Sequence, residues 1–233
     1  MDLFNRIGDL IIILIFANIS QCLRVKDEFF KRNKEMCMRV AKQPFFDVDL
    51  VVGKPWKVFY TWNMKLDGAI SCFEFTFKNA NVQTINRVWS EMGEYLEQQP
   101  TWEAATLSLY VGPSKHEMLL FADQGPAGSF VGVPNMVRSS SLIPVRKGVS
   151  LIKFQFKLLS EGKYLLITDC NQGVASLGAR SEEPPNSSEI EGLVAGLELG
   201  DGFPVCAKES NKNEEFIVTS NVSKFVSAHE FEA

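Results

Sequence analysis

The chain has 233 residues, a formal net charge of −4 and 45% hydrophobic residues. The acidic balance excludes a basic surface for nucleic acid. The length suits a single all-β domain, and no internal repeat is visible along it.

The first predicted element along the chain is a secretory leader. Residues 10–17 (LIIILIFA) form an apolar run that is too short to span a bilayer but typical of a signal-peptide core. Small residues at Ser20 and Cys22 favour cleavage after Cys22, with cleavage after Ser20 as the alternative. A buried N-terminal helix is the other interpretation of this run. No second apolar run reaches membrane-spanning length, so we expect a secreted, extracellular protein without a membrane span.

Four widely spaced cysteines follow the leader. Cys37, Cys72, Cys170 and Cys206 allow three disulfide pairings in an oxidising compartment, and the residues alone do not choose among them. Buried free thiols are the alternative. A metal site is not expected, because no two of these cysteines have the close spacing of zinc ligands and the chain has only 2 histidines.

The dominant period in the next part of the chain is two, which predicts β-strands. Residues 56–62 alternate with a heavily aromatic face, residues 73–78 alternate with one apolar and one polar face, and Asp67-Gly68 between them signals a hairpin. Further strands are expected over residues 81–89, 104–111, 117–122, 129–133, 152–158 and 164–169. Residues 134–144, rich in serine and proline, are expected as a loop.

Eight antiparallel strands joined mostly by short turns indicate a closed up-and-down β-barrel, since closure removes exposed sheet edges. Ser188 begins a capping box and apolar residues follow at helical spacing, so we expect a helix that ends near Gly200 and packs outside the barrel. The predicted fold class is therefore all-β, an eight-stranded antiparallel barrel with one C-terminal helix. The predicted divisions are a signal peptide over residues 1–22, a barrel domain over residues 23–210 and a polar tail over residues 211–233.

These elements resemble the lipocalin family, in particular the secreted insect type that includes bilin-binding proteins. Gly53-Lys54-Pro55-Trp56 is similar to the G-x-W signature of the opening strand, with Pro55 as an extra residue, and residues 164–170 are similar to the eighth strand with its terminal cysteine. Arg180 stands where the family keeps an arginine just after that strand. The resemblance implies that Gly53 and Trp56 are structural and that Arg180 packs across Trp56 in a cation–π contact. It also implies the disulfides Cys37–Cys170 and Cys72–Cys206.

The inner face of this barrel is the candidate binding site. A lining rich in aromatic and branched side chains suits a flat, poorly soluble molecule such as a pigment or lipid. The residues expected to contact it are Val58, Tyr60, Trp62, Phe73, Phe75, Phe77, Leu107, Leu109, Phe154 and Phe156. The alternative is that these side chains simply fill the barrel. No cofactor is expected beyond this non-covalent hydrophobic ligand.

We therefore expect a secreted protein that binds or transports a small hydrophobic molecule. The alternative is a barrel that binds another protein through the loops over residues 92–102 and 134–144. Catalysis is not expected, because a nucleophile would have to rely on His116 alone and the adjacent Glu182 and Glu183 read as a solvated loop.

Two sequons in predicted surface segments mark a glycoprotein. They lie at Asn186 and Asn221.

Overall fold

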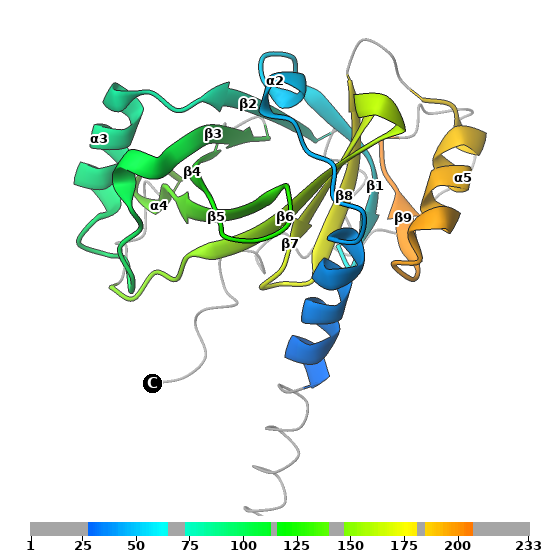
Figure 1. Cartoon of the computed structure of the whole chain (residues 1–233), viewed down its shortest axis with the longest axis horizontal. Coiled ribbons are helices and arrows are strands. Elements are labelled where there is room, and N and C mark those ends of the chain that lie inside the picture. Colours follow the sequence, from blue (N-terminus) through cyan, green and yellow to red (C-terminus); the bar gives the residue numbers. More distant parts are fainter. Residues whose placement is uncertain (1–27, 65–72, 113–115, 140–146, 181–184, 207–233) are drawn as a thin grey trace, which may run out of the picture.

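The structure is a computed structural model that describes residues 28–64, 73–112, 116–139, 147–180 and 185–206. The expected signal peptide, the Asp67-Gly68 turn and the tail over residues 211–233 lie outside these described residues. Within them, the main element is an antiparallel sheet that closes on itself (Figure 1). None of the helices in the described ranges combines the length and apolar character needed to cross a membrane.

Eight strands form the closed antiparallel up-and-down barrel that the alternation predicted. Each strand pairs with the next along the chain, and β1 pairs with both β8 and β2, which closes the ring. The strands are β1 (Trp56–Trp62), β2 (Glu74–Asn79), β3 (Ala105–Val111), β4 (His116–Ala122), β5 (Ser129–Pro134), β6 (Ile152–Leu159), β7 (Tyr164–Asp169) and β8 (Val174–Arg180). A short strand, β9 (Gly202–Pro204), pairs with the last residues of β1 beyond the point where β2 leaves it.

Residues 81–89, expected as the third strand, instead lie in a helix, α3 (Val82–Met92). Asn81 caps this helix, because its side chain accepts the backbone N–H three residues later at 2.9 Å. Val88 and Met92 lie one turn apart and are fully buried against the barrel. The prediction was wrong because a short apolar pattern with polar residues between fits either period.

The strand that restores the count to eight is β8, which the alternation did not reveal. Residues 164–169 are therefore β7, and Arg180 is the last residue of β8 rather than a residue after the final strand. Ala175, Gly178 and Ala179 make β8 rich in small residues, so its apolar contrast is weak.

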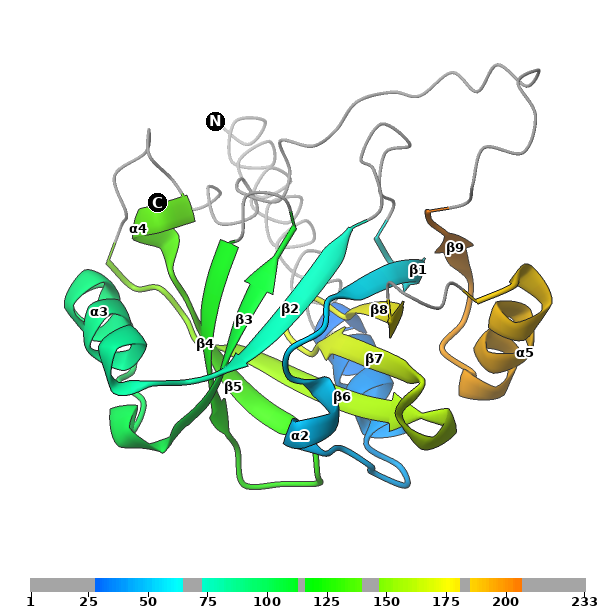
Figure 2. The ribbon, with the colours of Figure 1, turned by 90° about the horizontal axis from the view of Figure 1, so that it is seen from above.

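Helices cover the outside of the barrel on two sides (Figures 1 and 2). On one side, α3 and the short α4 (Met136–Ser139) share an apolar cluster with β4 and β5. On the other side, α5 (Ser187–Leu197) and the helix over residues 28–40 share a cluster with β1, β7 and β8. The expected C-terminal helix is therefore present, although Asn186 rather than Ser188 caps it and it ends at Leu197. In contrast, α4 lies in a stretch expected as loop. The other short helical elements are α2 (Val48–Val51), η1 (Trp102–Ala104) and η2 (Ser160–Gly162).

Candidate ligand-binding site in the barrel

The inward-facing side chains of the barrel form one apolar cluster, here called the interior cluster. Residues that lie opposite one another in neighbouring strands share a face, as Phe77 and Leu109 do. The buried members are Val51, Trp56, Val58, Phe75, Phe77, Leu107, Leu109, Leu120, Phe130, Phe154, Phe156, Leu158, Leu165 and Ile167, and Phe73 packs against them. The predicted ligand-binding residues on this face are thus Val58, Phe73, Phe75, Phe77, Leu107, Leu109, Phe154 and Phe156.

A β-bulge in β1 turns two of the predicted ligand-binding residues outward. The register against β8 shifts between Val58 and Tyr60, so Phe59 is the extra residue. Beyond it, Tyr60 and Trp62 pack in the outer cluster beneath the helix over residues 28–40 and α5. The expectation that both share the inward face with Val58 is therefore wrong, because strict alternation assumed an unbroken strand.

The half of the interior nearest Trp56 is solid. Phe156 lies at its centre, with ring centroids of Phe77, Phe130 and Phe154 at 5.7, 5.3 and 5.5 Å. Phe46, from the segment before α2, adds a ring 5.6 Å from Phe156. Phe77 and Phe156 have no accessible surface at all, so no space as large as a water molecule lies beside them.

Gly128 lets the chain pass close to the backbone of Phe156. It has a left-handed φ of 85°, which favours glycine. A Cβ atom built there would lie 2.1 Å from the backbone oxygen of Phe156 and 3.1 Å from the Cβ of Phe46. The backbones of Gly128 and Phe156 can lie this close together only when residue 128 has no side chain.

Another part of the interior keeps some accessible apolar surface and is here called the far end. It begins at Phe75, which lies opposite Trp56 in the register of β1 and β2, and it extends away from Trp56. Phe75, Ile167 and Phe154 retain 6%, 7% and 8% exposure. Partly buried apolar side chains continue this surface toward the strand ends. We define the far-end wall as Phe73, Phe75, Val111, Met118, Ile152, Phe154 and Ile167.

Asp169 provides a polar group beside the far-end wall. It lies opposite Phe154 in the register of β6 and β7, so its side chain shares the inward face. Burial raises the pKa of this carboxyl, although the backbone N–H groups of Gln172 and Asn171 donate to it and act in the opposite direction. A carboxylate already engaged in this way mainly fixes the turn between β7 and β8.

The Trp56 end of the barrel is sealed as the resemblance implied. The Arg180 guanidinium carbon lies 4.0 Å from the Trp56 ring centroid, and Arg180 also donates to the backbone oxygens of Lys54 and Leu50. The Trp56 indole N–H donates to the Val51 oxygen at 3.1 Å. Gly53 has a left-handed φ of 96° in the turn between these elements. The predicted contact between Arg180 and Trp56 is therefore present.

One predicted disulfide is present among the described residues. Cys37 and Cys170 are bonded, with their Cα atoms 5.6 Å apart, and they join the helix over residues 28–40 to the end of β7. Cys206 is also disulfide-bonded. Its expected partner, Cys72, lies outside the described residues, as does the sequon at Asn221.

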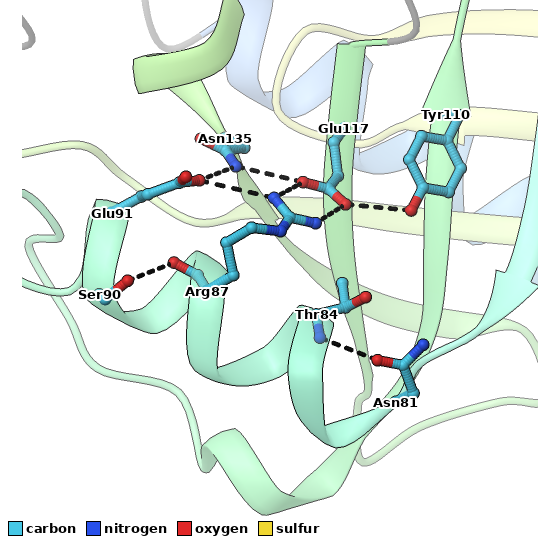
Figure 3. Close-up of polar contacts among 8 residues, drawn as sticks. All are labelled: Asn81, Thr84, Arg87, Ser90, Glu91, Tyr110, Glu117 and Asn135. Carbon is cyan, nitrogen blue, oxygen red and sulfur yellow. Dashed lines mark hydrogen bonds and ion pairs between the residues drawn. The ribbon is translucent and has the colours of Figure 1, made fainter.

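A polar cluster outside the barrel was not foreseen (Figure 3). This Glu117 cluster consists of Arg87, Glu91, Tyr110, Glu117 and Asn135. Arg87 donates from two nitrogens to the two Glu117 carboxylate oxygens at 2.5 Å each, and Tyr110 donates to one of them at 3.0 Å. Asn135 donates to Glu117 at 3.2 Å and to Glu91 at 2.7 Å. Because Arg87 belongs to α3, the cluster fastens this helix to β3 and β4.

The charges in the Glu117 cluster reinforce one another. Burial opposes ionisation of Glu117, but hydrogen bonds from Arg87 and Asn135 outweigh it and lower the pKa of the carboxyl. Burial and the adjacent Glu117 charge raise the pKa of Tyr110. The carboxylate is therefore charged and fully hydrogen-bonded at neutral pH, which suits a structural clamp rather than a general base. The spacing of Arg87 and Glu91, four residues apart, is the helix signal that sequence reasoning passed over.

No protein-family profile matches this chain, and no curated protein matches it by sequence. The closed eight-stranded antiparallel barrel is compatible with the lipocalin fold.

Proposed function

We propose that this chain is a secreted, divergent lipocalin-like protein, similar to the insect type, that binds and transports a small hydrophobic molecule at the far end of its barrel. The observation that carries this proposal is the far-end wall, whose inward apolar side chains remain accessible above a solid aromatic floor. Apolar surface of this kind is stabilised when a ligand removes it from water, by about 25 cal/mol per Å².

The solid floor limits the size of the ligand that we propose. Val58, Phe77, Leu107, Leu109 and Phe156 have 2% exposure or less, so they support the wall from below rather than touching the ligand. We expect the ligand to contact Phe73, Phe75 and Phe154 and their neighbours in the far-end wall. This favours a compact or flat molecule that fits in half of the barrel.

The proposed location and the non-catalytic role rest on separate observations. An intramolecular disulfide such as Cys37–Cys170 is typical of oxidising compartments, which supports secretion. The carboxylate of Glu117 is occupied by Arg87 and Tyr110, and His116 lies exposed at the start of β4. These positions support a binding function over an enzyme.

Native mass spectrometry of the secreted full chain, before and after organic extraction, tests the proposal. The expected result is the loss of one defined small mass on extraction. Ile152→Glu places a charge on the far-end wall and is expected to abolish the bound mass. Val82→Glu is the matched control, because it makes the same kind of change on the exposed first residue of α3. An unchanged mass for the wild-type protein contradicts the carrier function.

A second candidate function is protein binding through the loops at the far end. The observation that favours it is the filling of the interior by Phe46, which leaves less of the barrel for a ligand. In that case extraction releases no small mass from the wild type or from Ile152→Glu.

A further inference from the structure

We propose that Asn186 carries an N-linked glycan and that the same side chain caps α5. Asn186-Ser187-Ser188 is a sequon, and each of these residues is exposed at the N-terminus of the helix. The proposal does not depend on the ligand proposed for the barrel.

The oxygen and the nitrogen of the Asn186 carboxamide have different roles. Its oxygen accepts the backbone N–H of Glu189 and the hydroxyl of Ser188, both at 2.8 Å. Among the described residues, none accepts a hydrogen bond from its nitrogen. Because the two atoms branch from one planar carbon, an oxygen turned toward the helix leaves the nitrogen facing away from it. A glycan on the nitrogen thus leaves the cap intact.

The modification is an ordinary group transfer in the secretory pathway. The Asn186 nitrogen forms a bond to the anomeric carbon of an oligosaccharide that is held on a polyprenyl diphosphate. The bond from that carbon to the diphosphate oxygen breaks, the diphosphate leaves with the electron pair, and the amide nitrogen loses one proton. The Cys37–Cys170 disulfide is typical of oxidising compartments, and this chemistry takes place in a compartment of that kind.

The position of Asn186 keeps a glycan away from the far-end wall. Lys163, at the turn before β7, pairs with Glu189 in the first turn of α5 at 2.6 Å. The same turn lies at the Trp56 end, where Arg180 closes β8. A glycan would therefore cover the sealed end of the barrel and leave the proposed ligand contacts clear.

The test uses the full chain secreted from a eukaryotic host, with Asn221→Gln in every variant so that the second sequon does not contribute. Peptide mass spectrometry before and after peptide-N-glycosidase treatment is expected to find a glycan at Asn186. Asn186→Asp keeps the capping oxygen and Ser188→Ala keeps the asparagine, so both are expected to lose the glycan with little change in Tm. Asn186→Ala removes glycan and cap together and is expected to lower Tm.

Two results would overturn the proposal. One is secreted, folded protein whose Asn186 peptide carries no glycan, and the other is retention of the unglycosylated wild-type chain inside the cell. A fall in Tm for Asn186→Asp equal to that for Asn186→Ala would contradict the capping part alone. Ligand release on extraction is measured on the same samples, so failure of the carrier function is seen separately.

Discussion

Replacing Phe156 by alanine tests whether the barrel interior is solid. The side chain is fully buried and its ring contacts those of Phe46, Phe77, Phe130 and Phe154. Loss of its burial costs about 2 kcal/mol of transfer free energy. A residual void on the order of 50 Å³ adds about 1.2 kcal/mol at roughly 24 cal/mol per Å³. We therefore expect the free energy of unfolding to fall by about 3 to 4 kcal/mol.

Urea unfolding followed by tryptophan fluorescence measures this loss, with an unchanged dependence on denaturant as the sign of two-state behaviour. Phe45→Ala is the matched control, because Phe45 is the same residue type, lies three positions before α2 and is 46% exposed. It is expected to cost about 0.5 kcal/mol or less. If Phe156→Ala cost less than about 1 kcal/mol, the ring would border open space, and our description of a solid floor would be refuted. Should the alanine variant not fold, Phe156→Leu is expected to lose about 1.5 kcal/mol.

Three further predictions concern other parts of the molecule. Glu117→Gln is expected to lower the free energy of unfolding, measured with denaturant, by about 2 kcal/mol. Because Arg87 lowers the pKa of the Glu117 carboxyl below its ordinary 4.5, the wild type should lose this stabilisation as the pH falls through the pKa of the folded state, whereas the variant should not. Joint replacement of Cys37 and Cys170 by alanine removes a link across 133 positions and should cost about 5 kcal/mol on a chain-entropy estimate, whereas equal unfolding midpoints would contradict it. Gly128→Ala should lower Tm, since its left-handed φ of 85° disfavours a side chain and the Phe156 backbone leaves no room for a methyl group; circular dichroism would show an unchanged Tm if this reasoning failed.

The parts of the fold that could be predicted are those set by local pattern. Phe73, Phe75 and Phe77 alternate with polar residues, and the structure places all three on the inward face. The contact between Trp56 and Arg180 could be predicted from the family resemblance, because it depends on few residues and these have fixed places in the fold. Such features depend on one strand or one motif at a time.

The parts that could not be predicted depend on tertiary context. The bulge at Phe59 leaves no mark on the composition or on the alternating pattern of the sequence, yet it turns Tyr60 and Trp62 to the opposite face of the sheet. Strand β8 contains several small residues, and small residues give little apolar alternation. Phe46 enters the interior from outside any strand, so strand alternation cannot reveal it.

The insertion of Phe46 also bears on how the molecule assembles. Phe46 leaves the ribosome early, whereas Phe130 and Phe156, which enclose it, are made much later. The aromatic floor therefore cannot be completed until most of the chain has been synthesised, and contacts so distant in sequence are characteristic of slow folding. Until then the early segment exposes an aromatic side chain that a chaperone could bind. Removing the residues before α2 would therefore not only shorten the chain but also leave the barrel interior unfilled.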